Sequence, residues 1–222
     1  MKKRNVVLLI AAIILLDQAL KFYIKLNFYL GEERVIMHNW FFLHFVENEG
    51  MAWGWKFGGG FGKIILTLFR LVAVVWGSFL LKDFIQKKYS KGFIICAALI
   101  YAGALGNLLD SMFYGLIFND PFYPAVAKLV HFGTGYESFL HGRVVDMLYF
   151  PIIRSNYPSW MPFVGGQNFE FFAPVFNIAD ASISIGVITL LIFQNKFFKR
   201  EDEQHHATIE TKTIIDDQTQ VS

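Results

Sequence analysis

The sequence predicts an all-α membrane protein with four transmembrane helices, an extracytoplasmic cradle loop that contains β-structure, and a cap segment at the membrane interface. Of its 222 residues, 55% are apolar and only 17% are charged, a composition typical of polytopic membrane proteins. Four apolar runs reach the length of about 20 residues that a bilayer core requires. We expect a single membrane-embedded domain over residues 1–200 and a disordered cytoplasmic tail over residues 201–222.

The four predicted spans cover about residues 5–23, 63–81, 92–113 and 173–193. The first begins with MKKR and an apolar run, as a cleaved signal peptide does, but no small-x-small cleavage site follows it. Because the run leads instead into Asp17, Gln18 and Lys21, we expect an uncleaved first span. Pro174 suits the first turn of a helix and is expected to mark the start of the fourth span.

The positive charges beside the spans predict the orientation of the chain. Lysine and arginine gather before the first span, between the second and third, and after the fourth, in MKKR, KDFIQKKYSK and NKFFKR. Such loops remain on the cytoplasmic side, so both termini are expected inside. The long connections, residues 25–62 and 114–172, are then outside.

Each long connection carries its own structural prediction. The weak alternation of RVIMHNWFFLHFVEN in the first connection predicts strands that hold an extended peptide. In the second, PFYPAVAKLVHF predicts a short interfacial helix within the cap segment.

The content of charge, cysteine and histidine excludes several classes of function. The net charge of +2 and the scattered lysines and arginines do not provide the basic patch that nucleic acid requires. The single cysteine, Cys96, rules out an internal disulfide or a multi-cysteine metal site. Neither a His-Glu-x-x-His spacing nor a Gly-x-Ser-x-Gly elbow occurs. We therefore expect no nucleic acid partner, no metal and no cofactor.

Polar residues from separate segments are predicted to converge just below the outer surface. Asn107 and Asp110 lie near the outer end of the third span, and Asn177 and Asp180 near the outer start of the fourth. The loop that contains Asn48 is on the same side. Two neighbouring carboxylates cannot both ionise easily, so such a pair can activate a water with one member and protonate a leaving amine with the other.

Other readings of these polar residues remain open. Asp17 and Lys21 are four residues apart on one helix face and are interpreted as a structural pair that braces neighbouring helices. Arg70 either extends toward the outer surface or pairs with an acid. Membrane carboxylates also mark ion paths, but transporters place them at the midplane between repeated halves, and no such repeat is visible. A non-catalytic scaffold would leave the converging acids unexplained.

Five segments of the chain, DQALK, ENEGMAW, GALGNLLD, GRVVDMLYF and FNIADASISIG, carry a resemblance to a known family. Across residues 14–190 the sequence resembles the lipoprotein signal peptidase (signal peptidase II) family. The resemblance implies an aspartic endopeptidase of the bacterial inner membrane with its active site near the periplasmic face. Its implied substrates are diacylglyceryl-modified prolipoproteins, cut just before the lipidated cysteine. Membrane lipid is the other expected partner, and the chain is expected to be a monomer.

The resemblance also implies roles for individual residues. Asp146 and Asp180 match the catalytic dyad, while Asp17 and Lys21 match the family's first-span pair. The residues that match those shaping and hydrogen-bonding the site are Asn48, Gly50, Asn107, Asp110 and Asn177.

The chain departs from the family pattern in two places. An arginine usually follows GNxxD in the family, but Ser111 stands there in this sequence. Arg143, just before VVD, is the candidate to take over the contact of the missing arginine. The connection between Asp110 and Asp146 is longer than is typical, and a second extension follows Asp146. Both are rich in aromatic residues, proline and glycine, which favours a cap in the outer interface.

Overall fold

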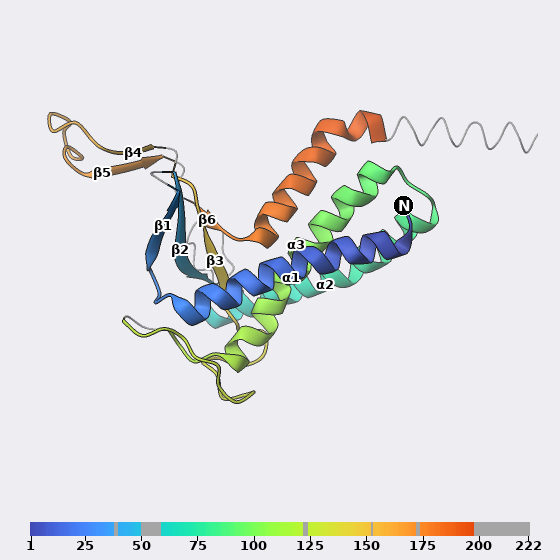
Figure 1. Cartoon of the computed structure of the whole chain (residues 1–222), viewed down its shortest axis with the longest axis horizontal. Helices are drawn as coiled ribbons and strands as arrows, with labels where there is room; N and C mark the ends of the chain where they lie inside the picture. Colours follow the sequence, from blue (N-terminus) through green and yellow to red (C-terminus); the bar gives the residue numbers. More distant parts are fainter. Residues whose placement is uncertain (38–39, 50–58, 122–123, 152, 172–173, 198–222) are drawn as a thin grey trace, which may run out of the picture.

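Long helices and a small antiparallel sheet make up the fold of the computed structural model (Figure 1), which describes residues 1–37, 40–49, 59–121, 124–151, 153–171 and 174–197. The helices are α1 (Lys3–Asn27), α2 (Gly59–Gln86), α3 (Lys91–Ile117) and a fourth helix, Ile178–Phe197, drawn in orange. All four are long and apolar enough to cross a membrane, which confirms the predicted spans.

The outer surface of α2 is apolar, as contact with lipid requires. Phe69, Trp76 and Phe79 are 68%, 63% and 67% exposed. Because soluble proteins rarely expose apolar patches of this kind, this surface indicates a helix that faces hydrocarbon.

The fourth helix begins later than the sequence predicted. Pro174 precedes a short strand, β6 (Val175–Phe176), and the helix starts only at Ile178, so the prediction for Pro174 is wrong. The Oδ1 atom of Asn177 accepts a hydrogen bond of 2.8 Å from the backbone N–H of Asp180. Asn177 is therefore the N-cap, and Asp180 lies in the first turn.

The main sheet contains β1 (Glu33–Met37), β2 (Phe41–Asn48), β3 (Val144–Tyr149) and β6, in the order β1-β2-β3-β6 with antiparallel pairing throughout. The strands predicted in the first connection are thereby confirmed. β2 pairs with β3 so that Val46 lies opposite Asp146 and Asn48 opposite Val144. The sheet lies at the end of α1 that is remote from the N-terminus (Figure 1).

A two-stranded hairpin, β4 (Ile153–Asn156) and β5 (Asn168–Phe171), extends away from this sheet (Figure 1). The described part of the segment predicted as an interfacial helix contains turns and isolated bridges and no helix, so that prediction is wrong. Its backbone bonds run across the chain: Asn119 N–H donates to the Lys128 carbonyl, and Val130 N–H to the Ile117 carbonyl. Pro121 and Pro124 also disfavour a helix across this stretch.

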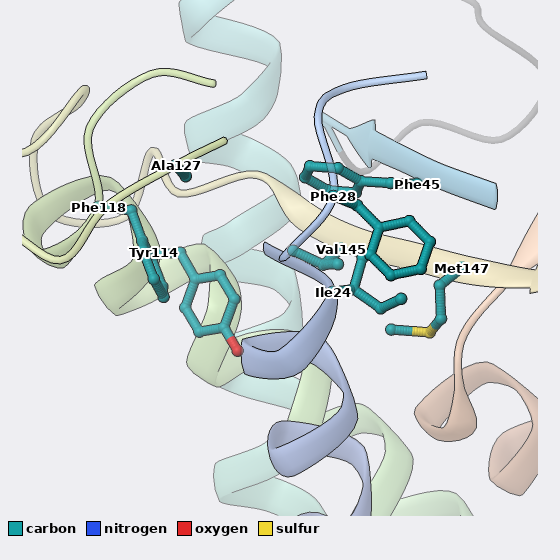
Figure 2. Close-up of a cluster of buried hydrophobic side chains, with 8 residues drawn as sticks. All are labelled: Ile24, Phe28, Phe45, Tyr114, Phe118, Ala127, Val145 and Met147. Carbon is teal, nitrogen blue, oxygen red and sulfur yellow. The ribbon is translucent and has the colours of Figure 1, made fainter. Parts of the chain in front are cut away.

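An apolar cluster fixes the sheet against the ends of the helices (Figure 2). It consists of Ile24, Phe28, Phe45, Tyr114, Phe118, Ala127, Val145 and Met147, drawn from α1, β2, α3, β3 and the segments that follow α1 and α3. Successive side chains of a strand point to opposite faces. Since Val145 and Met147 enter this cluster, Asp146 between them points to the other face.

Candidate functional site

A buried lysine joins α1 to α3 beneath the sheet. The Nζ atom of Lys21 lies 2.8 Å from Asp17 Oδ2 and 2.7 Å from Asp110 Oδ2, and it donates to Asn107 Oδ1 at 2.9 Å. Gln18 Nε2 donates to the other oxygen of Asp110 at 2.8 Å. A buried charge is tolerated only when it is paired and hydrogen-bonded, and Lys21 meets both conditions.

The fourth helix docks onto this ion cluster. Asp17 Oδ1 accepts a hydrogen bond of 2.9 Å from the backbone N–H of Ala179, an interaction that the positive end of a helix favours. A Cβ atom at Gly103 of α3 would lie 2.2 Å from the carbonyl oxygen of Ala179. Glycine at this position therefore allows α3 and the start of the fourth helix to approach closely.

Two asparagine amides join the carboxylates of Asp146 and Asp180. Asn177 Nδ2 donates to Asp146 Oδ1 at 2.7 Å, and Asn107 Nδ2 donates to Asp180 Oδ1 at 2.7 Å. The amides also contact each other, since Asn177 Nδ2 lies 3.1 Å from Asn107 Oδ1. Asn48 Nδ2 reaches the second oxygen of Asp146 at 3.2 Å. Residues from β2, β3, α3 and the fourth helix thus form one hydrogen-bonded group.

The environment of Asp146 favours its protonated form. This side chain is 3% exposed, and burial, followed by the negative charge of Asp180, raises its pKa to about 7. Hydrogen bonds from Asn48 and Asn177 act in the opposite direction but do not cancel the effect. A carboxyl that holds a proton near neutral pH beside a second carboxylate can take part in acid–base chemistry.

Arg143 lies in a different ion cluster. Its Nη1 atom is 2.9 Å from Glu47 Oε2 and 2.6 Å from Asp120 Oδ1, and its guanidinium stacks over the ring of Tyr136 at 4.7 Å from the centroid. Burial lowers the pKa of Arg143, but the hydrogen bonds to Glu47 and Asp120 outweigh burial and raise the pKa overall. This cluster connects the segment after α3 to the sheet.

The residue beside Ser111 is a different arginine. Arg70 of α2 donates from Nη1 to the Ser111 hydroxyl at 3.2 Å, so a guanidinium from another helix stands next to the serine.

Comparison with known proteins assigns the chain to a family. A family model described as signal peptidase (SPase) II matches residues 9–196. This chain belongs to the signal peptidase II family. A lipoprotein signal peptidase from Porphyromonas gingivalis is 46% identical over 185 residues, 83% of this chain and 80% of the relative. A lipoprotein signal peptidase from Amoebophilus asiaticus is 31% identical over 203 residues, which cover 88% of this chain and 79% of the relative.

Solved structures share the fold of this signal peptidase II. A bacterial membrane enzyme determined at 2.3 Å resolution superposes with a TM-score of 0.55 at 24% identity, covering 87% of this chain and 89% of its own. A second bacterial membrane enzyme, determined at 1.9 Å resolution, superposes with a TM-score of 0.52 at 24% identity. The match covers 86% of this chain and 92% of the solved chain. The protein is thus a bacterial membrane protease of the class that processes lipoprotein signal peptides.

Most of the residues singled out from the sequence of this signal peptidase II lie together. They are Asp17, Lys21, Asn48, Asn107, Asp110, Asp146, Asn177 and Asp180. Arg143 lies apart from them in its own ion cluster. Gly50 lies outside the described residues.

Sequence reasoning gave no role in the site to two polar positions on α1. Gln18 bonds Asp110, and Lys25, which is fully buried, pairs with Glu47 of β2. The spacing of Asp17, Lys21 and Lys25 could have revealed the second position, because residues four apart share one helix face. A polar stripe on an otherwise apolar span indicates a face that is turned toward protein.

The raised pKa of Asp146 predicts an alkaline limit for this signal peptidase II. Its carboxyl keeps a proton below about pH 7 and loses it above. If Asp146 is the acid that the family resemblance implies, cleavage should fall as the pH rises through that value. Asn48→Ala removes a hydrogen bond that stabilises the charged carboxylate. The pKa should then rise further, and the alkaline limb of kcat/KM should move to higher pH.

The matched control is Asn27→Ala, which removes an exposed amide bonded to the Tyr23 carbonyl at the end of α1. This variant should keep the parent profile. An alkaline limb that stays in place or moves to lower pH in Asn48→Ala would contradict the role that the family resemblance implies for Asp146.

Proposed function

We propose that this signal peptidase II is an aspartic endopeptidase that cuts diacylglyceryl-modified prolipoproteins just before the lipidated cysteine, with Asp146 and Asp180 as the catalytic dyad. The observation that carries the proposal is the pair of amide bridges. Asn177 holds Asp146 and Asn107 holds Asp180, each at 2.7 Å, and the two amides contact each other. The carboxylates are therefore kept near one another by side chains that do not titrate.

We assign the resting proton to Asp146 and the role of base to Asp180. The pKa of Asp146 is raised to about 7 by burial and by the charge of Asp180. Asp180 lies in the first turn of the fourth helix and accepts a hydrogen bond of 2.7 Å from the Asn107 amide. This division gives the pair one acid and one base.

The proposed reaction uses both members of the pair. Asp180 removes a proton from water as the water oxygen attacks the scissile carbonyl carbon, and the proton on Asp146 stabilises the developing oxyanion. The tetrahedral intermediate then collapses as the amine of the lipidated cysteine leaves with a proton from the dyad. The released signal peptide ends in a carboxyl group, and the dyad again holds one proton.

The position of the site supports its proposed depth in the membrane. Asn107 and Asp110 lie in the last part of α3, and Asp180 lies at the start of the fourth helix, so the group occupies one end of the spans beside the sheet. We place this end at the periplasmic face and both termini in the cytoplasm, because basic residues gather at the opposite ends. We further propose that residues 1–200 form one domain and that the protein acts as a monomer.

Cleavage is expected to require the lipid on the substrate cysteine. Two acyl chains in the bilayer would hold the scissile bond at the height of Asp146 and Asp180, whereas an unmodified signal helix could slide in depth. A matched precursor without the diacylglyceryl group should be cut at least about 100-fold more slowly. The measurement is kcat/KM for the two precursors with purified protein in lipid.

A precursor whose glyceryl group carries two acetyl esters in place of the long acyl chains serves as the control. It keeps the chemistry at the cysteine but loses the anchor in the bilayer, so it should also be cut slowly. Equal rates for the lipidated and the unmodified precursor would refute lipid positioning, even if the aspartate chemistry held.

A further inference from the structure

Arg70 lies beside the proposed dyad, and the proposed mechanism gives this cation no role. Its half-buried side chain lies on α2, and Nη1 donates to the Ser111 hydroxyl at 3.2 Å. In the part of the chain that the structure describes, this is its only hydrogen bond, and no carboxylate lies within ion-pair distance. A guanidinium carries five N–H donors, so most of the donors of Arg70 have no protein partner among these residues.

Ser111 fixes the orientation of this guanidinium. The serine Oγ donates its own proton to the Asn107 carbonyl at 3.0 Å, so the hydroxyl can only accept from Arg70. Asn107 is also the residue whose amide holds Asp180. The arginine is therefore tied, through one serine, to the α3 turn that positions the dyad.

The charges around Arg70 direct it toward the site. The carboxylates of Asp180, Asp110 and Asp146 all lie near enough to attract it. The charge of Asp110 is already balanced by Lys21, whose Nζ lies 2.7 Å away. Asp146 and Asp180 of the proposed dyad are therefore the carboxylates that attract the Arg70 guanidinium. The guanidinium is close enough to sense both carboxylates of the dyad but is bonded to neither.

We propose that Arg70 binds a carbonyl oxygen of the substrate beside the scissile bond, either in the peptide main chain or in the ester of the diacylglyceryl group. A guanidinium that loses its water when substrate binds needs hydrogen-bond acceptors, and carbonyl oxygens are the acceptors that a lipidated peptide brings to this depth. By the family resemblance, Ser111 occupies a position where an arginine is usual, and Arg70 of α2 places a guanidinium beside it. This inference rests on the proposed function.

Substrate binding by Arg70 can be distinguished from two other roles, because each predicts a different result when the arginine is removed. If Arg70 only tuned the charge of the dyad, its removal would move the pH profile and leave KM unchanged. If it only held α2 in place, its removal would lower stability; α2 has a separate contact in Thr67, whose hydroxyl lies 3.1 Å from the Leu140 carbonyl oxygen.

The test uses the purified full-length protein in lipid with a synthetic diacylglyceryl precursor peptide. Arg70→Gln should lower kcat/KM about 10- to 100-fold, the effect of losing a hydrogen bond to a charged group, mainly through a higher KM. Any movement of the alkaline limb reports the loss of the arginine's charge near the dyad, and the rise in KM is the readout of substrate binding. Lys82→Gln, which removes an exposed charge from the same helix, is the control and should match the parent.

A rescue keeps the test informative if Arg70→Gln is unstable. The double variant Arg70→Ala/Ser111→Arg places a guanidinium from α3 near the position that Arg70 occupied. It should reverse much of the rise in KM that Arg70→Ala causes alone. A dialkyl ether analogue of the substrate, which has no ester carbonyls, distinguishes the two possible carbonyl oxygens. If Arg70→Gln raises KM for this analogue as much as for the ester substrate, Arg70 binds the peptide carbonyl. If it no longer raises KM, Arg70 binds the ester carbonyl.

Two results would overturn the inference. One is an Arg70→Gln variant with the parent's KM, whether its activity is intact or its pH profile has moved. The other is a double variant that folds but recovers nothing. Asp146→Asn is assayed alongside: if it stays active, the proposed function fails, whatever Arg70 does.

Discussion

Asp146→Asn and Asp180→Asn are each expected to abolish cleavage while the protein remains folded and inserted in the membrane. The amide has nearly the shape of the carboxylate and can keep the contacts to Asn177 and Asn107, but it cannot take up or release the proton. Loss of one acid–base group typically costs about 10²- to 10⁴-fold in rate. We expect losses at or beyond the upper limit, since the members of a dyad act as a unit. Single-turnover cleavage of a lipidated precursor measures the effect.

Asp83→Asn is the matched control, because the Asp83 side chain forms an exposed ion pair of 2.9 Å with Lys87 on the surface, and such pairs contribute little. Folding is checked by thermal unfolding in detergent. The raised pKa of Asp146 means that the folded state binds this proton more strongly than the unfolded state. The parent therefore loses stability as the pH rises from about 4 to about 7, and Asp146→Asn should lose less over that range. Full turnover by either dyad variant would end the assignment.

Lys21→Met is expected to destabilise the protein strongly. The substitution fills a similar volume but leaves Asp17 and Asp110 buried without their shared cation. Removing one partner of a buried ion pair typically costs about 3–5 kcal/mol. The expected readout is a large drop in the unfolding temperature in detergent, with a loss of cleavage that follows the loss of folded protein.

The matched comparison is a triple variant that combines Lys21→Met with Asp17→Asn and Asp110→Asn. Because it removes both uncompensated charges, it should recover much of the stability lost in the single variant. Lys87→Met, which breaks the exposed pair with Asp83, should change stability little. If Lys21→Met were as mild as Lys87→Met, the ion cluster would not hold α1 to α3 as described.

The sequence predicted features that depend on local composition. Hydropathy over about 20 residues identifies a span wherever it lies, and all four spans were found. The alternation in the first connection likewise predicted β1 and β2. The start of the fourth helix was placed too early, because Pro174 is compatible with a first turn and the competing N-cap at Asn177 was not considered.

Features that join distant segments could not be predicted from local patterns. The pairing of β2 with β3 and the bond between Arg70 and Ser111 join residues that are far apart in sequence. Arg143 was the natural candidate near Ser111 because it is close to Asp146 in the chain, but its charge is satisfied by Glu47. The assignment of Asp146 and Asp180 to the dyad came from family resemblance and remains a prediction.

The amide of Asn177 ties the assembly of the site to the completion of the chain. Its oxygen caps the fourth helix, and its nitrogen holds Asp146 on β3. Helix initiation and the seating of this carboxylate therefore depend on the same side chain. A nascent chain that has inserted only its first three helices contains Asp146 but neither Asn177 nor Asp180, so it holds half of the proposed dyad. Proteolytic activity would then emerge only when the last helix enters the bilayer, which would keep unfinished copies of a membrane protease inert during biosynthesis.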